Sequence, residues 1–393
     1  MNHKTIRIAI DANEANVQHR VGSNVYAFEL IKAIYQLTKA DQSLDFTILL
    51  SSEPIADLPI QRAGWKYKII KPTFLWTQFA EPIYLFLNRR KIDILFTPGH
   101  YAPRCCVVPY VSSIMDLAYL NFPEQFNEND LVQLKHWTKY SVKKARKVIA
   151  ISEFTKADIM RHYQKKSEDV VVAYPAITNT IPASSVTTKN FFGKFKIKKP
   201  YFLFLGTIQP RKNLIRVVEA YEQLCRRLSS QQFKKVQKIN LLPQLVIAGK
   251  IGWLADPIID RIKRSSFCER IILTGYIADD IKPALYAGAT ASLLLGLHEG
   301  FGIPPLESLY YDCVPIVSNT TSLPEVVGEA GFQVNPYDIK KIVIAMEKAF
   351  KLSVKNKAIY KRKGKKQLKK FSWQKSAQTV LLTLKQVVYE HAK

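Results

Sequence analysis

Short, almost continuous apolar runs alternate along the chain with longer segments whose apolar residues recur at helical spacing. Ile6–Ile10 and Val148–Ile151 are two of the runs, and Val25–Leu37 is one of the amphipathic segments between them. A strand that is apolar at every position is buried on both faces, which is typical of a parallel sheet covered by helices. The same alternation of apolar runs and amphipathic segments starts again at Tyr201–Leu205. The sequence therefore predicts an α/β protein with two doubly wound, Rossmann-like domains.

The length of the chain supports the same division. A chain of 393 residues exceeds the size at which single hydrophobic cores stop growing, so two domains are the default. Residues 178–200 are rich in Thr, Ser and Lys and lack clear periodicity, and we interpret them as an interdomain connection. The predicted domains cover 1–177 and 201–370 and face each other across a cleft, and a C-terminal helix over 371–393 is expected to return to the first domain.

Several element boundaries follow from local pattern. Phe74–Leu87 is expected to be helical with a break near Pro82, and Ala291–Leu297 is expected to be a strand. Asp279 or Asp280 is expected to cap the helix that follows them.

The strongest local signal is His298–Leu309, which reads HEGFGIPPLESL. Two glycines flank Phe301, which we expect to be exposed. Pro304 and Pro305 fit the first turn of a helix, where a backbone N–H has no partner anyway. The stretch therefore predicts a strand end, a glycine turn and a helix N-terminus, which is a candidate anion site.

Two glutamates, Glu299 and Glu307, bracket this turn. Carboxylates beside an anion site are better suited to accept hydrogen bonds from the hydroxyls of a sugar or a ribose. For one glutamate alone, a favourable interaction with the helix dipole is the simpler explanation. Two glutamates that bracket the turn are a more specific sign of a binding site than one glutamate.

The loop Gly206–Asn213, GTIQPRKN, directly follows the first predicted strand of the second domain. Its Arg211 and Lys212 could balance a diphosphate, one as a planar multi-donor group and the other as a point charge. The alternative is a pair of solvated loop cations.

In the first domain, Asp116 ends a predicted strand and Gly22 lies in the loop after the first strand. Each could belong to a site at the carboxyl ends of the strands. The structural alternatives are a turn cap for Asp116 and an ordinary turn glycine for Gly22. His100, also in a loop after a strand, is more often incidental.

The chain is strongly basic, with a formal net charge of +26. This balance favours anionic partners such as nucleotide phosphates, nucleic acid or an anionic membrane surface, although general solubility would also account for it. The stretch 74–91 carries several aromatic residues and has a basic end, and it fits either a membrane-interface helix or an amphipathic core helix. The basic run Lys355–Lys370 fits a solvated face, with membrane or nucleic acid contact as the sharper option.

The sequence shows few features that would indicate a cofactor site or a targeting segment. The five cysteines form no Cys-x-x-Cys pair or zinc-like cluster, and we interpret them as reduced structural residues of a cytoplasmic protein. The N-terminus reads as a strand rather than a signal peptide, and no apolar run is long enough to span a bilayer. No Asp-x-Asp triplet occurs, which argues against a metal-dependent transferase.

Three motifs in order resemble glycosyltransferase family 4, whose members are retaining enzymes of the GT-B fold. They are Glu-Gly-Phe-Gly with Glu307, Arg211-Lys212-Asn213, and SLPEVVGEAG at Ser322–Gly331. GTIQPRKN and MDLAYLNFPEQF are most similar to the mannosyltransferase-like branch that acts in bacterial surface polysaccharide synthesis. The resemblance implies a nucleotide-sugar donor, with GDP-mannose favoured, and a saccharide or lipid-linked saccharide acceptor. It implies no cofactor and no metal, and a cytoplasmic protein, with a peripheral place at the inner membrane face as a further option.

The resemblance also implies site roles. Glu307 would bond the ribose, Glu299 the hydroxyls of the transferred sugar, and Lys212 would neutralise the diphosphate. The implied catalytic set is Glu299, Lys212, Arg211 and Asp116, and the other donor-binding positions are Gly300, Phe301, Gly302, Ile303, Gly206, Tyr276 and Gly22.

Two positions depart from the family pattern. Thr207 stands where many members have an arginine, and Arg211 would substitute for it. Met115 stands where many members have a histidine, so that His100 or Asp116 would have to fill its place.

Two other function classes fit doubly wound or basic proteins. A nicotinamide-dependent oxidoreductase requires Gly-x-Gly-x-x-Gly after a first strand, and neither Ile6–Ile10 nor Tyr201–Leu205 is followed by that motif. A nucleic-acid-binding protein is supported by charge alone.

Overall fold

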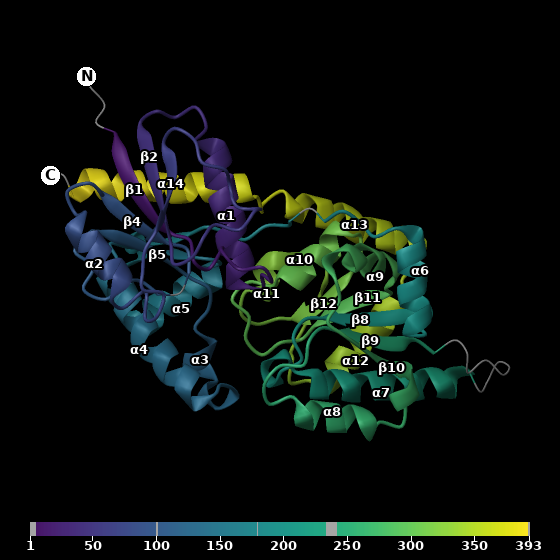
Figure 1. The fold of residues 1–393 in the computed structure, drawn as a ribbon. Helices are drawn as coiled ribbons and strands as arrows, with labels where there is room; N and C mark the ends of the chain where they lie inside the picture. The colour runs from purple at the N-terminus through teal and green to yellow at the C-terminus, as the bar shows by residue number, and fades with distance from the viewer. Residues whose placement is uncertain (1–4, 100, 179, 233–241, 392–393) are drawn as a thin grey trace. The chain divides into compact units, whose positions relative to one another are not determined.

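The computed structural model describes residues 5–99, 101–178, 180–232 and 242–391. The chain forms two compact units: unit 1 comprises Met1–Ala176 and Phe371–Lys393, and unit 2 comprises Ile177–Lys370. Each unit is a parallel sheet packed against helices (Figure 1). The predicted α/β class with two doubly wound units is confirmed.

The sheet of unit 1 has the strand order β3-β2-β1-β4-β5-β6-β7. Ile8 pairs with Phe46 on one side and with Ile94 on the other, so the order changes direction between β1 and β4. The strands are β1 (Ile6–Asp11), β2 (Leu44–Leu50), β3 (Trp65–Ile69), β4 (Ile94–Thr97), β5 (Tyr110–Ile114), β6 (Lys147–Ala150) and β7 (Val170–Val172). The helices of its N-terminal part are α1 (Ser23–Leu37), α2 (Ala80–Leu87), α3 (Ala118–Asn121), α4 (Glu128–Lys144) and α5 (Glu153–Tyr163).

The last helix of the chain, α14 (Trp373–His391), packs on unit 1. The ring of Trp373 lies 5.7 Å from that of Tyr26 in α1, between centroids, and Lys385 forms an ion pair with Asp41 at 3.3 Å. The C-terminal segment is therefore part of the N-terminal unit.

The sheet of unit 2 has the order β10-β9-β8-β11-β12-β13. Phe202 of β8 pairs with Leu245 of β9 on one side and with Ala291 of β11 on the other. In an open parallel sheet, ligands bind at such a reversal, beyond the carboxyl ends of the strands. The strands are β8 (Tyr201–Leu205), β9 (Gln244–Ala248), β10 (Ile271–Gly275), β11 (Ala291–Leu294), β12 (Pro315–Ser318) and β13 (Phe332–Val334). The helices are α6 (Ser185–Lys194), α7 (Leu214–Gln232), α8 (Asp256–Lys263), α9 (Lys282–Gly288), α10 (Ile303–Tyr310), α11 (Leu323–Val327), α12 (Ile339–Phe350) and α13 (Val354–Leu368).

The segment 178–200 is more than a connection, in contrast to the expectation. It contains α6, whose start is capped by Ser184 Oγ accepting a hydrogen bond from the Thr187 amide at 3.1 Å. Phe191, Phe192 and Phe195 pack against the core of unit 2. The phenylalanines share one helical face but occupy only the end of α6, and most residues before them are polar, which is why the sequence pattern missed the helix.

Three predicted boundaries were also wrong. The helix over Phe74–Leu87 begins only at Ala80, because Pro82 falls in its first turn, where proline is tolerated and causes no break. The strand from Ala291 ends at Leu294, before the glycine turn. Neither Asp279 nor Asp280 caps a helix, because a short 3₁₀ turn over Asp279–Ile281 precedes α9.

Candidate functional site

The reversal point of unit 2 is formed by two loops that are hydrogen-bonded to each other. One is Gly206–Asn213 after β8, and the other follows β11. The Leu297 amide donates to the Arg211 carbonyl at 2.8 Å, and Arg211 Nη1 donates to the His298 carbonyl at 2.9 Å. The structure therefore brings together the two motifs that the sequence analysis singled out separately.

Glu299 is the centre of a buried ion cluster. Its carboxylate accepts hydrogen bonds from Lys212 Nζ at 2.7 and 2.9 Å and from Arg211 Nη1 at 3.4 Å. The side chains are 7%, 12% and 17% exposed for Glu299, Lys212 and Arg211, so the two cations are not solvated loop residues. Buried charges persist when they are paired and hydrogen-bonded, and here two cations face one carboxylate. The excess positive charge suits a second anion.

Gly296 leaves the space that this carboxylate occupies. A Cβ atom placed on Gly296 would lie 2.5 Å from Glu299 Oε1. The backbone of the turn is fixed from α11, because Ser322 Oγ donates to the carbonyls of Glu299 at 2.8 Å and Phe301 at 2.6 Å. Ser322 thus acts as a positioning residue for the turn.

The structure corrects one expectation about this turn. Phe301 is 3% exposed rather than exposed. A large aromatic ring between two small glycines gains more from burial than from contact with water. Phe301 can therefore contribute its backbone to a site, but its ring belongs to the core.

The start of α10 offers fewer amide donors than an ordinary helix. Gly302 precedes the helix with φ +116°, and Pro304 and Pro305 occupy its first turn without N–H groups. The backbone donors at this end are those of Gly300, Phe301, Gly302 and Ile303, which coincide with the predicted donor-binding positions.

Glu307, in the same helix, has its own cationic partner. Its carboxylate accepts hydrogen bonds from Lys282 Nζ at 3.2 Å and from the Tyr286 hydroxyl at 2.9 Å. Burial raises the pKa of Glu307, and Lys282 and Tyr286 oppose that shift. Sequence reasoning missed Lys282 and Tyr286, because nothing in their spacing marks them as neighbours of Glu307.

Two further donor-binding candidates lie at other strand ends of unit 2. Gly206 follows β8 and packs against Gly249, which follows β9. Tyr276 follows the edge strand β10 and is 69% exposed. Within the described residues, no hydrogen bond or ion pair joins Tyr276 to the Glu299 cluster.

The remaining two candidates belong to unit 1. Gly22 precedes α1 with φ +54°. Asp116 follows β5, and its Oδ1 accepts a hydrogen bond from the Ala118 amide at 3.0 Å, which is the turn-capping contact expected of the structural alternative. Met115 beside it is buried. His100 lies outside the described residues.

Unit 1 contains a different kind of carboxylate pair. Asp11 ends β1, and Glu81 of α2 is fully buried with neither oxygen hydrogen-bonded to any described residue. Burial raises the pKa of Asp11 to about 7. Burial, together with the charge of Asp11, raises the pKa of Glu81 well above its usual value.

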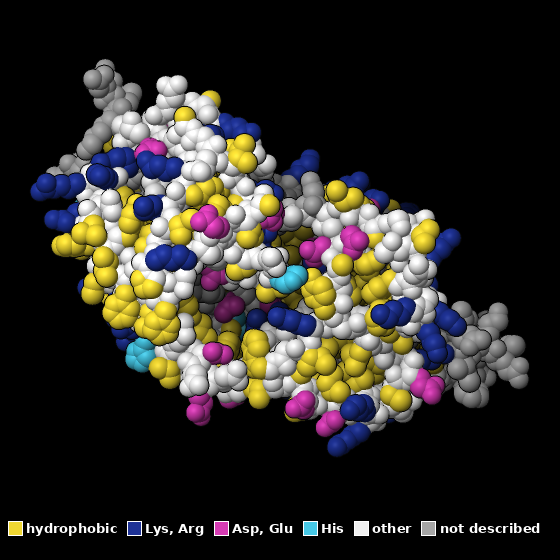
Figure 2. All heavy atoms as spheres, viewed as in Figure 1, with side chains coloured by type: hydrophobic (Ala, Val, Ile, Leu, Met, Phe, Trp, Pro, Cys, Tyr) yellow, Lys and Arg dark blue, Asp and Glu magenta, His cyan; other side chains and the backbone are white. Residues whose placement is uncertain are grey.

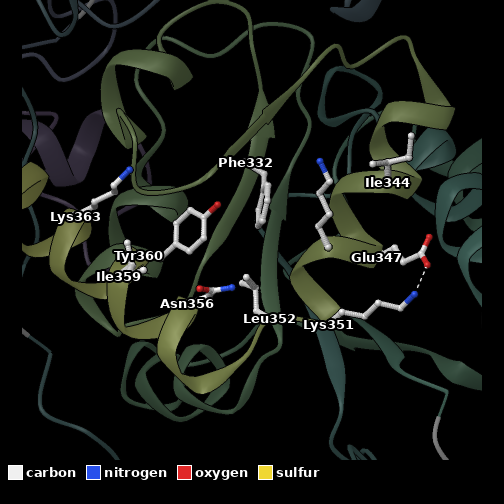
Figure 3. A pocket seen from close by; sticks show the side chains of 10 residues that line it. Phe332, Ile344, Glu347, Lys351, Leu352, Asn356, Ile359, Tyr360 and Lys363 are labelled. Atoms are coloured by element: carbon white, nitrogen blue, oxygen red, sulfur yellow. Dashed lines mark hydrogen bonds and ion pairs between the residues drawn. The ribbon is translucent and has the colours of Figure 1, made fainter.

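A hollow in unit 2 lies between α12 and α13 (Figure 3). Phe332, Tyr360 and Lys363 are among the residues that line it, and none of the predicted site residues does so. Among the described residues, no three His, Cys, Asp or Glu side chains are grouped as a metal site would require. None of the helices in the described parts of the chain is both long and apolar enough to span a bilayer.

Comparisons with known proteins agree with the geometry of unit 2. The family model for glycosyl transferases group 1 matches residues 186–367. The O-antigen chain mannosyltransferase B of Escherichia coli is 27% identical over 290 residues, which is 73% of each chain. The serotype-specific mannosyltransferase WbdA of Escherichia coli is 29% identical over 277 residues, and the match spans only 31% of that longer protein.

A solved structure shares the fold of the whole chain. Anabaena Alr3699/HepE, crystallised with UDP and glucose, superposes with a TM-score of 0.67 over 97% of this chain and 99% of its own, at 15% identity.

Proposed function

We propose that the chain is a glycosyltransferase of the family 4 type and that it transfers a hexose, mannose by preference, from a nucleotide-diphosphate sugar. The acceptor would be a saccharide or a lipid-linked saccharide in surface polysaccharide synthesis. The names of the relatives in Escherichia coli support mannose and an O-antigen-like product. The observation that carries the proposal is the buried cluster of Glu299, Lys212 and Arg211 beside the start of α10.

The donor diphosphate would bind at the excess positive charge of this cluster. Lys212 and Arg211 already share one carboxylate, and a diphosphate would supply the further negative charge that two cations can accommodate. The amides of Gly302 and Ile303 would add neutral donors. Stabilisation of charge on the leaving group is the contribution that such preorganised donors make to catalysis.

The two glutamates would accept hydrogen bonds from hydroxyl groups of the donor. Each carboxylate oxygen has two acceptor positions, so Glu299 can hold Lys212 and still accept a bond from a sugar hydroxyl. Glu307 would accept the ribose hydroxyls in the same way, with Lys282 and Tyr286 holding it in place.

For the reaction we propose retention of configuration without a metal ion. The bond between the anomeric carbon and the diphosphate oxygen breaks while the bond to the acceptor oxygen forms on the same face. The departing phosphate oxygen takes the proton of the acceptor hydroxyl. Lys212 and Arg211 supply the positive charge that a metal ion would otherwise provide.

The donor is GDP-mannose in this proposal, and the site of action is the cytoplasm at the inner face of the membrane. One structural neighbour was crystallised with UDP and glucose, so the base and the sugar have to be tested directly. The full chain should be incubated with GDP-mannose, UDP-glucose and UDP-galactose while nucleotide release and the thermal midpoint are measured. We expect the largest response to GDP-mannose. No response to any nucleotide sugar would refute the transferase proposal for this site.

A further inference from the structure

The hollow between α12 and α13, which we call the α12–α13 hollow, has no part in the proposed transfer reaction. Its volume is about 760 Å³, within the range of roughly 300–1,000 Å³ that small-molecule sites occupy. None of the residues assigned to the donor lines it. Its apolar lining consists of Phe332, Ile344, Leu352, Ile359 and Tyr360.

An aromatic pair stands at the centre of the α12–α13 hollow (Figure 3). The ring centroids of Phe332, from the edge strand β13, and Tyr360, from α13, are 5.3 Å apart at an interplanar angle of 37°. Both residues are only partly buried, and Ile344 and Ile359, which line the same hollow, are 43% and 38% exposed. Exposed apolar surface that is framed by polar groups indicates a ligand site.

Three polar groups of the lining have hydrogen-bonding capacity to spare. Among the described residues, Lys348 forms no ion pair, and neither the side-chain amide of Asn356 nor the Tyr360 hydroxyl forms a hydrogen bond. An ammonium group only donates, whereas an amide and a phenol both donate and accept. The α12–α13 hollow therefore offers donors and acceptors next to an aromatic surface.

The other charges of the hollow are compensated. Lys351 Nζ lies 2.5 Å from Glu347 Oε1, and Lys363 Nζ lies 3.1 Å from Glu329 Oε2. On the face shown in Figure 2, Lys and Arg side chains of unit 2 are likewise interspersed with Asp and Glu side chains. A strongly acidic ligand, such as an acidic amphipathic helix of a partner protein, would have to compete with these carboxylates, whereas a neutral ligand would not.

We propose that the α12–α13 hollow is an additional saccharide site that holds the glycan chain while it is extended, an inference that rests on the proposed transfer function. A pyranose ring has a face of weakly positive C–H groups, which suits the negative face of an aromatic ring such as Tyr360. Its hydroxyls both donate and accept, so that Lys348, Asn356 and the Tyr360 hydroxyl would bond them. A chain held in this way stays at a high effective concentration between transfers.

The test uses the full chain and linear α-mannotetraose, without a nucleotide sugar. Amide hydrogen exchange in residues 344–363, measured over a range of oligosaccharide concentrations, gives the Kd of this site alone. We expect slower exchange there, and the same Kd in saturating GDP. Y360A should weaken binding by about tenfold through the loss of aromatic contact, and K348A/N356A by about as much through the loss of hydrogen bonds.

Matched controls separate the hollow from general surface effects. K365A/K366A removes two exposed lysines of α13 that lie outside the lining, and Y389A removes a tyrosine that is 58% exposed on α14. Both should bind mannotetraose like the wild type. No protection of residues 344–363 in the wild type, or equal weakening in test and control variants, would overturn the proposal. So would an amphipathic peptide of Glu and Leu that protects these residues when mannotetraose does not.

Nucleotide release from GDP-mannose, measured on the same variants, keeps the two proposals apart. Y360A and K348A/N356A should release nucleotide like the wild type. A response to the donor without protection by mannotetraose refutes the saccharide site alone. Absence of a response to every donor refutes the transfer reaction, and the exchange data still decide on the hollow. Because Lys348 and Asn356 are exposed, K348A/N356A keeps the test decisive if Y360A, which loses its contact with Phe332, fails to fold.

Discussion

Both units place acidic residues near the first strand of a doubly wound sheet, but the two sites differ in their counter-charges. In unit 2, Glu299 lies between Lys212 and Arg211, and Glu307 is held by Lys282. In unit 1, Glu81 is buried without a hydrogen-bond partner among the described residues, and Asp11 is the neighbour that raises its pKa. The same fold thus holds carboxylates paired with cations in one unit and a buried carboxyl group without a hydrogen-bond partner among the described residues in the other.

This difference indicates where the chemistry lies. A carboxylate held by cations can exchange one partner for a ligand, whereas an acid whose pKa is raised by burial contributes mainly to the pH dependence of stability. Substitutions in the two units test this contrast.

Lys212→Ala should lower kcat by roughly a hundredfold to a thousandfold, because it removes the charge proposed to stabilise the leaving diphosphate. The measurement is nucleotide release from the preferred donor under saturating conditions. Lys250→Ala removes an exposed lysine that follows β9 in the same unit, and it should leave kcat unchanged. Equal rates for Lys212→Ala and the wild type would contradict the assignment.

Glu307→Ala should weaken donor binding by roughly tenfold to a hundredfold, the cost of losing a hydrogen bond to a charged group. Calorimetric titration with the donor nucleotide measures this effect, and kcat should change less than Kd. Glu329→Ala, on a largely exposed glutamate of the same unit, is the matched control. An unaltered Kd for Glu307→Ala would exclude Glu307 from the ribose site.

Gly296→Ala should disturb the cluster by steric displacement alone. Its Cβ would approach Glu299 Oε1 to 2.5 Å, so the carboxylate has to move away from Lys212. We expect a loss of about 1–3 kcal/mol in the free energy of unfolding, as for overpacking, together with reduced turnover. Gly193→Ala in α6, where a Cβ meets no atom within 4 Å, should be neutral or slightly stabilising. Chemical denaturation distinguishes the two, and a silent Gly296→Ala would show that the carboxylate position is not critical.

Glu81→Met should make the pH dependence of the stability of unit 1 shallower. The raised pKa values of Glu81 and Asp11 mean that the folded state holds protons that the unfolded state has released. The free energy of unfolding therefore falls as pH rises from about 4.5 through about 7, by up to about 1.4 kcal/mol per pH unit for each proton. Denaturant titrations across this pH range measure the slope, and the exposed Glu168→Met should leave it as in the wild type. Equal slopes for Glu81→Met and the wild type would show that Glu81 does not contribute to the pH dependence of the free energy of unfolding.

Much of the fold followed from the sequence for a clear physical reason. Apolar runs such as Ile6–Ile10 and Tyr201–Leu205 avoid water on both faces only in the middle of a parallel sheet that helices cover on both sides. The motif around Glu299 and Glu307 was also visible, because a glycine turn and two prolines mark a strand end and a helix start.

The partners of those residues were not predictable. Lys282 and Tyr286 meet Glu307 only through tertiary packing, and Ser322 reaches the turn from another helix. The orientation of α2 posed a similar problem, since a helix with two apolar sides has no pattern that says which side meets the core. Phe301 was misjudged because a ring beside glycines looks accessible when its burial depends on contacts distant in sequence.

Amide hydrogen exchange of the full chain with and without saturating GDP tests whether unit 2 binds the donor at the Glu299 cluster. We expect slower exchange in residues 206–213 and 299–303, with no change in residues 74–91. Slower exchange confined to other segments, or no change anywhere in unit 2, would contradict it.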